Sequence, residues 1–291
     1  MRYACRSLSQ KAFLVMVMFP ILRRAMPFVA LPILTLIAWE APAWAEEPRD
    51  LCPDRPGLGT PACTVEPGAV VAELGLGDWT RESDAATRTD TVTVGDALLR
   101  VGLTGSLEGQ LGWTAYGRVR TRDKASGAID KTGGVGDVTL ALRRNLRNPD
   151  GSGFSLAVMP YVTLPVSKMP VGAGDWSAGL LVPVSFDLSP GLSLAFTPEV
   201  DAAVDGDGDG RHLRFGSVAG LGFDLTDSLS ASTELALYSD RDPAGRSTEA
   251  LLGLSAAWQP DKTMQFDVGL NLGLNPDSPD SELYVGVVRR F

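Results

Sequence analysis

The chain has 291 residues, of which 44% are hydrophobic and 7% aromatic, and 32 of them are glycines. This composition supports one large folded domain and excludes a disordered or fibrous chain. The formal net charge of −9 at pH 7 argues against nucleic acid as a partner, because binding to phosphates depends on clustered Lys and Arg side chains.

Residues 1–45 have the pattern of an export signal. Arg23 and Arg24 precede an apolar run from Ala25 to Trp39, and the small-residue site Ala43-Trp44-Ala45 follows it. We therefore expect a signal peptide over residues 1–45 that is cleaved after Ala45. A retained helical anchor is the alternative, although this run is shorter than the roughly 20 residues that a spanning helix needs.

Residues 46–67 are expected to form a short periplasmic segment that contains a cysteine pair. Cys52 and Cys63 follow the signal, and the residues between them are rich in Pro and Gly. Export places the pair in an oxidising compartment, where disulfide bonds persist, so we predict a Cys52–Cys63 disulfide. Two cysteines without further ligands cannot complete a tetrahedral metal site.

From residue 68 to residue 291 the sequence alternates apolar with polar or glycine residues in about twelve stretches that turn residues separate. In the clearest stretch, Met264, Phe266 and Val268 are apolar while Gln265 and Asp267 between them are polar. A strand places these two sets on opposite faces. We predict an all-β fold, an antiparallel barrel of about 12 strands in up-and-down order. A soluble barrel or sandwich also buries one face of each strand, so alternation alone does not separate these folds.

Strand length, connections and aromatic placement favour a transmembrane barrel. Several stretches alternate over the roughly 9–11 residues that a tilted membrane strand needs, whereas strands of soluble sheets centre on roughly 5–6. Short turns such as Ser189–Gly191 alternate with longer polar segments, including 78–91, 120–136 and 205–212, which we expect as loops at the opposite end. Six aromatic residues fall on the apolar face near the short turns, as at a membrane interface: Phe154, Phe186, Phe223, Trp258, Phe266 and Phe291.

The C-terminus resembles the last strand of bacterial outer-membrane proteins. Phe291 ends the chain, with Val287, Val285 and Leu283 at alternate positions before it, while Arg289 departs from the pattern. Closure of a barrel requires this strand to pair with the first one, because unpaired backbone groups are costly in lipid. We expect Phe291 to be the C-terminal assembly signal, with outer-membrane lipid and the barrel insertion machinery as partners.

Two segments resemble the "putative MetA-pathway of phenol degradation" family of outer-membrane proteins. These are Gly134–Arg143 (GVGDVTLALR) and Pro160–Pro165 (PYVTLP). The family usually continues into Thr-Gly, where this chain has Val166-Ser167. The resemblance covers roughly Arg55 to Phe291 and implies a barrel in the bacterial outer membrane that passes small aromatic or apolar compounds.

Charged residues of both signs fall on the face that alternation assigns to the lumen. They could set the selectivity of a polar channel, or they could form a ladder of ion pairs that fills the barrel without an open path. The candidates are Glu73, Arg100, Glu108, Arg118, Asp137, Arg143, Glu199, Arg214, Asp224, Glu234, Glu249 and Asp267.

The run from Asp205 to Gly210 alternates aspartate with glycine, so Asp205, Asp207 and Asp209 are candidate calcium ligands. The glutamate expected at the twelfth position of a calcium loop is missing, because Gly216 stands there. A flexible, solvated loop is therefore the favoured interpretation. We expect no bound metal and no cofactor.

Passive transport of small solutes is the favoured function. An outer-membrane hydrolase is a weaker alternative, because a Ser-His pair would have to use His212, the only histidine, and no Gly-x-Ser-x-Gly sequence accompanies it. A structural barrel that does not conduct is the third possibility. We expect a channel for a small-molecule solute and no enzyme activity.

Overall fold

The computed structural model describes residues 49–168 and 170–291, and the predicted signal peptide, residues 1–45, lies outside them. The described part of the chain contains no helix of the length and apolarity needed to span a membrane. Its regular elements are fourteen strands: β1 (Val70–Ser83), β2 (Thr87–Thr104), β3 (Leu107–Asp123), β4 (Ile129–Gly134), β5 (Val138–Arg147), β6 (Phe154–Leu164), β7 (Ser177–Leu181), β8 (Val184–Ser189), β9 (Leu192–Val204), β10 (Arg211–Thr226), β11 (Leu229–Asp242), β12 (Gly245–Asp261), β13 (Met264–Gly273) and β14 (Ser281–Arg290).

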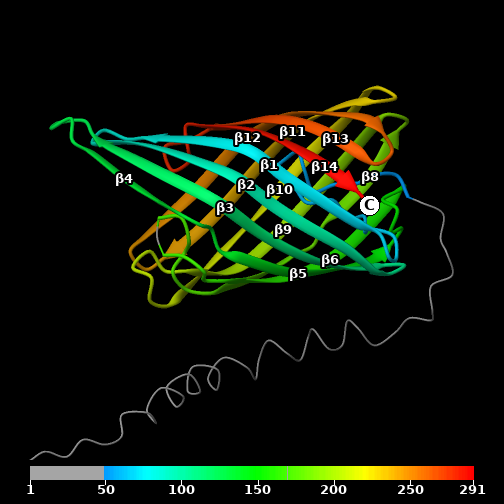
Figure 1. Ribbon diagram of the computed structural model, residues 1–291, viewed down its shortest axis with the longest axis horizontal. Helices are drawn as coiled ribbons and strands as arrows, with labels where there is room; N and C mark the ends of the chain where they lie inside the picture. Colours follow the sequence, from blue (N-terminus) through cyan, green and yellow to red (C-terminus); the bar gives the residue numbers. More distant parts are fainter. Residues whose placement is uncertain (1–48, 169) are drawn as a thin grey trace, which may run out of the picture. The chain divides into compact units, whose positions relative to one another are not determined.

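These strands form one closed antiparallel barrel (Figure 1). Pairing of β14 with β1 closes the sheet, as the sequence predicted for the last strand. β4 and β5 both pair with β3, and β7 and β8 both lie between β6 and β9, so each of these two pairs is one barrel strand in two pieces. The barrel therefore has twelve strand positions in meander order, which confirms the predicted fold.

A proline explains the break between β7 and β8. Pro183 has no N–H group to donate to a strand ladder, so regular pairing stops there. The neighbouring backbone groups remain paired across the gap: Val182 N donates to Pro198 O, and Ala157 N donates to Pro183 O, both at 2.9 Å.

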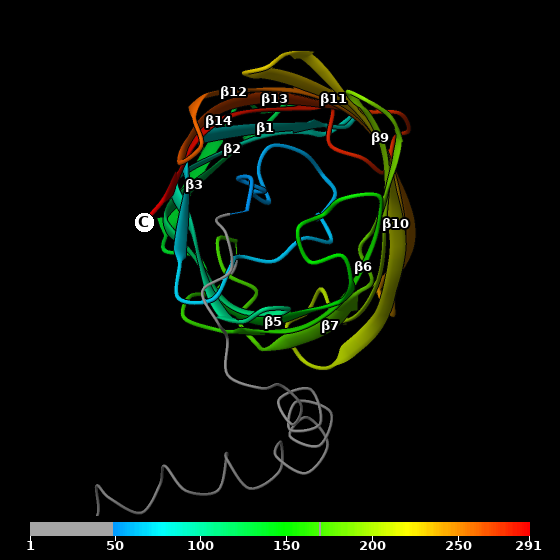
Figure 2. The ribbon, with the colours of Figure 1, turned by 90° about the vertical axis from the view of Figure 1, so that its right-hand side faces the viewer.

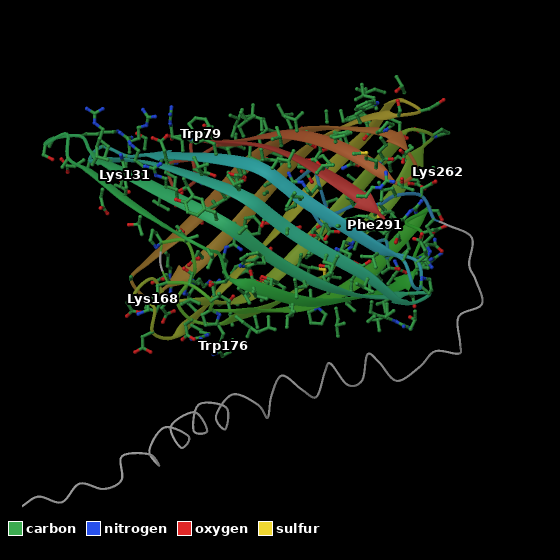
Figure 3. All side chains as sticks on the ribbon, in the orientation of Figure 1. Trp79, Lys131, Lys168, Trp176, Lys262 and Phe291 are labelled. Carbon is green, nitrogen blue, oxygen red and sulfur yellow. A yellow bond between two sulfur atoms is a disulfide. The ribbon has the colours of Figure 1, made fainter. Side chains whose placement is uncertain are left out.

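The two ends of the barrel differ. Hairpins of two to six residues join the strands at the end that carries Lys262 and Phe291, which we call the turn end (Figure 3). Lys131 and Lys168 lie at the opposite end, which we call the loop end, as Figure 3 shows. The longest connection at the loop end spans 165–176.

Two of the polar segments that we expected as loops, 78–91 and 120–136, are largely strands. Residues 78–83 and 87–91 extend β1 and β2, where Arg81 pairs across from Asp90. Residues 120–123 and 129–134 pair as β3 and β4. The expected loop at 205–212 is present over 205–210, and only its last two residues, Arg211 and His212, belong to β10. Polar side chains on both faces do not prevent a backbone ladder, so in the first two segments composition predicted loops where only turns of three to five residues exist.

The outer face of the barrel is apolar and the inner face is polar. On β13, Phe266 and Val268 are 38% and 45% exposed, whereas Gln265 and Asp267 between them are 1% and 6% exposed. Predicted aromatic residues of the turn end also meet on the outer face, where Phe154 stacks on Phe186 and Trp258 on Phe266. This distribution is the reverse of a soluble protein and is typical of a barrel surrounded by lipid.

Candidate functional site

The N-terminal segment, residues 49–66, runs inside the barrel from the turn end (Figure 2, blue). The predicted Cys52–Cys63 disulfide is present and closes a loop within this segment, with the Cα atoms 6.5 Å apart. We call residues 52–63 the disulfide loop. The alternation of apolar and polar residues predicted which side chains of the barrel wall face the lumen. It could not predict that the disulfide loop lies inside the lumen.

A buried charge network joins the disulfide loop to the wall. Arg100 of β2, with no exposed surface, lies 2.9 Å from Glu108 and 3.2 Å from Glu73. The loop contributes Asp54, whose carboxylate lies 3.0 Å from Arg100 and 2.6 Å from Arg143. Burial alone would raise the pKa of Asp54, but the positive charges of Arg100 and Arg143 outweigh it and hold that pKa below its ordinary value.

Backbone groups of the N-terminal segment also form hydrogen bonds with the wall carboxylates and guanidinium groups. Asp54 N and Arg55 N donate to Glu73 at 2.9 and 3.0 Å, and Val65 N donates to Glu108 at 2.7 Å. In the other direction, Arg100 donates to Cys52 O at 2.8 Å. The wall and the segment therefore supply most of each other's hydrogen bonds, which lowers the cost of burying these charges.

The disulfide loop also reaches the opposite wall. Arg55 pairs with the buried Asp267 of β13 at 3.1 Å. Leu58 N and Gly59 N donate to Glu234 of β11 at 2.7 and 3.0 Å. The loop thus spans the lumen from β2 and β3 to β11 and β13.

Glycine allows the close approach between the loop and Glu234. Gly57 has φ of 126°, and a Cβ atom built there would lie 2.7 Å from the Glu234 carboxylate. A larger residue at this position would be strained at this φ and would displace the Glu234 carboxylate that the loop binds.

A mostly apolar pocket lies in the lumen beside the charge network. Its volume is about 210 Å³. Ala141, Met159 and Leu181 form its buried apolar floor, and Tyr161 packs against them. Tyr161 donates a hydrogen bond to Glu199 at 3.0 Å and also contacts Asp201. The full lining comes from six strand pieces: Leu98, Gln110, Gly112, Thr139, Ala141, Met159, Tyr161, Leu181 and Glu199, which we call the apolar pocket.

The sequence of this barrel matches a known family over most of its length. The match covers residues 53–291, from the disulfide loop to the C-terminus, and the family is described as "Putative MetA-pathway of phenol degradation". The chain belongs to this family. Among curated proteins, none matches the sequence closely enough to count as a relative.

Solved structures similar to this family member are bacterial barrels of several kinds. The NanC porin is 9% identical with a TM-score of 0.47, over 76% of this chain and 98% of its own. The CymD monoaromatic hydrocarbon channel is 9% identical with a TM-score of 0.43, over 78% and 88%. The translocator domain of the autotransporter NalP from Neisseria meningitidis is 15% identical with a TM-score of 0.45, over 77% and 88%. At these values the similarity carries no argument about solute or activity.

The predicted lumen residues fall into several groups. Glu73, Arg100, Glu108, Arg143 and Asp267 are buried against the N-terminal segment, and Glu234 binds the disulfide loop. Glu199, Arg214 and Glu249 lie half-buried on the lumen wall, with Arg214 and Glu249 3.7 Å apart. Asp137 instead accepts hydrogen bonds from Val166 N, Ser167 N and Ala173 N, so it holds the backbone of the 165–176 loop.

Arg118 and Asp224 do not join these groups. Both are exposed. Arg118 pairs across from Val92, Val92 from Trp79, and Trp79 from Leu283, and Val92 and Leu283 are exposed on the outer face. Strict alternation counted from Glu108 puts Arg118 inside, but the outward side chains change parity along these strands, from Leu99 and Leu111 to Val92 and Tyr116. The neighbouring strand β1 has a register shift against β14 at Gly75–Gly77, at the same level of the sheet. Asp224 lies beside the turn at Gly191.

Sequence reasoning did not single out Asp54 or Tyr161. Asp54 lies outside every strand, so alternation does not apply to it, although its position between two cysteines and next to Arg55 is a usable signal. Tyr161 sits in the family segment PYVTLP, where parity with Met159 would have assigned it to the lumen.

Proposed function

We propose that this protein is a passive channel in the outer membrane of a Gram-negative bacterium, and that it passes small aromatic or apolar solutes. The observation that carries the solute class is the apolar pocket, which lies in a lumen whose wall is otherwise mostly polar or charged. An apolar cavity of roughly 150 Å³ is large enough to bind benzene. The pocket volume of about 210 Å³ therefore suits a solute with a single aromatic ring.

The outer face supports the proposed location. Large apolar side chains are exposed on every side of the barrel, among them Leu111, Leu235, Leu254 and Val285 at 42% to 53%. A soluble monomer rarely exposes so much contiguous apolar surface. A closed barrel leaves no unpaired strand edge in lipid, which is the other requirement for a membrane-spanning sheet.

The family description and the pocket point to the same solute class. A family named for phenol degradation fits a solute with an aromatic ring. Tyr161 and Glu199 place a phenol oxygen and a carboxylate at the rim of the apolar floor, where they could meet a polar substituent of the ring. In this mechanism the pocket replaces water around the ring while the polar rim orients the solute.

A liposome-swelling assay tests the proposal. Phenylalanine and glutamine are zwitterions that cross lipid poorly, so their influx reports on the barrel. We expect phenylalanine to enter several-fold faster than glutamine. Ala141→Phe fills the pocket and should abolish this preference, whereas Leu140→Phe, on the outer face with the leucine 40% exposed, should leave it unchanged.

A sealed barrel is the second candidate, and the charge network favours it. Arg100 and Arg143 are fully buried and paired, as in a lumen filled by ion pairs rather than open to solutes. Wild-type protein that admits neither amino acid would support this structural role and contradict transport. Equal rates of entry for both amino acids would contradict the preference for aromatic solutes but would still support a non-selective pore.

A further inference from the structure

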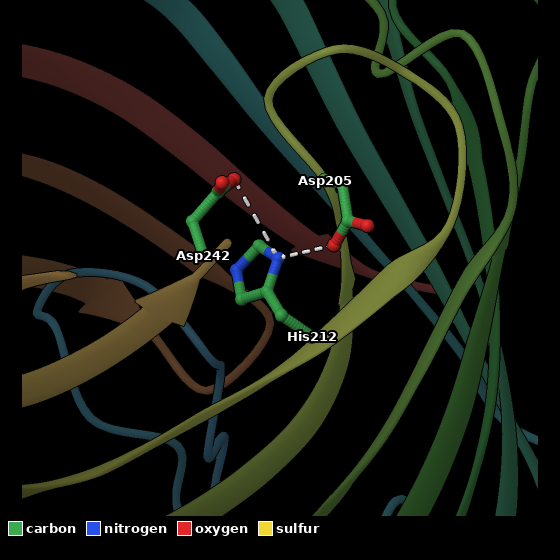
Figure 4. Close-up of side chains that lie close together, drawn as sticks. All are labelled: Asp205, His212 and Asp242. Carbon is green, nitrogen blue, oxygen red and sulfur yellow. Dashed lines mark hydrogen bonds and ion pairs between the residues drawn. The ribbon is translucent and has the colours of Figure 1, made fainter. Parts of the chain in front are cut away.

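Three metal-ligand side chains converge at the loop end, where β9, β10 and β11 meet. Asp205 directly follows β9, His212 is the second residue of β10, and Asp242 is the last residue of β11. Figure 4 shows both carboxylates directed at the imidazole. Asp205 Oδ1 lies 2.9 Å from His212 Nδ1, and Asp242 Oδ2 lies 3.6 Å from the same nitrogen.

These separations match the edges of a tetrahedral coordination shell. Zinc binds imidazole nitrogen and carboxylate oxygen at roughly 2.0–2.2 Å, so neighbouring ligand atoms of a tetrahedral ion lie roughly 3.4 Å apart. All three candidate ligand atoms lie within 4.8 Å of one another. One ion could therefore contact all of them after small movements, with water as the fourth ligand.

The surroundings hold these side chains in place. Asp240 Oδ1 lies 2.8 Å from His212 Nε2, on the far side of the ring. The contact is an ion pair without hydrogen-bond geometry, and a small rotation of the ring would let Asp240 accept the Nε2 hydrogen, which fixes the tautomer and the orientation of many metal-binding histidines. Asp242 accepts hydrogen bonds from Gly206 N at 2.6 Å and Ala244 N at 2.7 Å. His212 is only 5% exposed at its side chain, so the imidazole is not a freely moving surface group.

Charge also favours a bound cation. Three carboxylates, Asp205, Asp240 and Asp242, surround one imidazole, so the cluster keeps an excess of negative charge even when His212 is protonated. The neighbouring Arg211 pairs with Asp175 at 2.8 Å and lies over Trp176. A divalent ion would neutralise this excess negative charge and would link the ends of β9, β10 and β11.

We propose that Asp205, His212 and Asp242 bind one divalent transition-metal ion of the zinc class, and that Asp240 positions His212. An imidazole ligand selects zinc over calcium, which takes oxygen ligands. The site differs from the calcium loop considered for the Asp-Gly run, because Asp207 and Asp209 do not take part: Asp207 accepts a hydrogen bond from Asp209 N at 3.0 Å. The ion would tie the 205–210 loop to β10 and β11.

Isothermal titration of the full, histidine-tag-free protein in detergent with ZnCl₂ and CaCl₂ tests this site. We expect one zinc ion per chain, with calcium binding at least 100-fold more weakly. His212→Phe should abolish saturable zinc binding, and Asp240→Asn should weaken it by roughly 10- to 100-fold. Asp207→Asn, in the same loop but outside the cluster, should bind like the wild type.

A second measurement keeps the test independent of folding in the variants. Cobalt added to the wild-type protein should give the visible absorption of a four-coordinate ion and should be displaced by zinc. Gel mobility with and without heating shows whether each variant still forms the barrel. Absence of one-to-one zinc binding, undiminished binding in a folded His212→Phe variant, or a preference for calcium would each overturn the proposal.

Discussion

At the scale of single residues, Arg100 shows how the lumen is stabilised. Three carboxylates lie within 3.2 Å of its guanidinium group, and one of them, Asp54, comes from the disulfide loop rather than the wall. Burial removes the solvation of all four charges, so each depends on its partners. The network thus links the stability of the barrel to the position of the loop.

Replacement of Arg100 by methionine should destabilise the barrel strongly. The change leaves Glu73 and Glu108 buried without their main counter-ion, which typically costs about 3–5 kcal/mol. The temperature at which the folded form is lost on a gel without prior boiling measures the effect. Arg118→Met is the matched control, because Arg118 is exposed, and surface changes stay within about 0.5 kcal/mol. Equal losses in both variants would refute the role of the network.

At the scale of elements, the disulfide loop and its wall contacts act together. The disulfide closes a loop of about ten residues. Residues of this loop contact carboxylates on several wall strands, including β1, β11 and β13. A short closed loop loses less conformational freedom on docking than an open chain does, which stabilises the docked arrangement by about 2–3 kcal/mol.

Opening the disulfide should therefore loosen the lumen. The double variant Cys52→Ser, Cys63→Ser should admit glutamine several-fold faster than the wild type in the swelling assay, because the undocked loop no longer fills the barrel. Thiol reductant should reproduce this increase in the wild type and have no further effect on the double variant. A rate unchanged by either treatment would mean that the loop does not restrict flux.

At the scale of the whole molecule, the barrel depends on closure between β1 and β14. Phe291 N donates to Val70 O at 2.8 Å, so the last residue takes part in this pairing through its backbone, while its side chain is 76% exposed. The side chain thus contributes little to packing within the described barrel. Its proposed role as an assembly signal is separable from folding.

Phe291→Ala should separate assembly from stability. Purified protein refolded into detergent should match the wild type in thermal stability within about 0.5 kcal/mol, because the backbone pairing persists and the lost side chain is exposed. In cells, folded protein in the membrane fraction should fall several-fold. Phe266→Ala, another outward aromatic residue at the turn end, is the control and should keep its cellular level. A similar fall in both variants would contradict a specific signal.

The sequence alone determined the features that depend on neighbours along the chain. Alternation such as that from Met264 to Val268 is a local property, because each strand residue points opposite to the next. It predicted the barrel, about twelve strands and most of the inner charges, but it wrongly placed Arg118 in the lumen. The disulfide and the last barrel strand were also predicted from local sequence, from two nearby cysteines and from the alternation that ends at Phe291.

Tertiary structure alone decided what fills the lumen and which distant groups meet. The docking of residues 49–66 depends on charges at Arg100, Arg143 and Asp267, which are far apart in the chain and become one surface only when the sheet closes. The change of outward face along β2 and β3 and the meeting of Asp205 with Asp242 likewise depend on pairing between strands. Alternation describes one strand at a time, so it carries no information on these contacts.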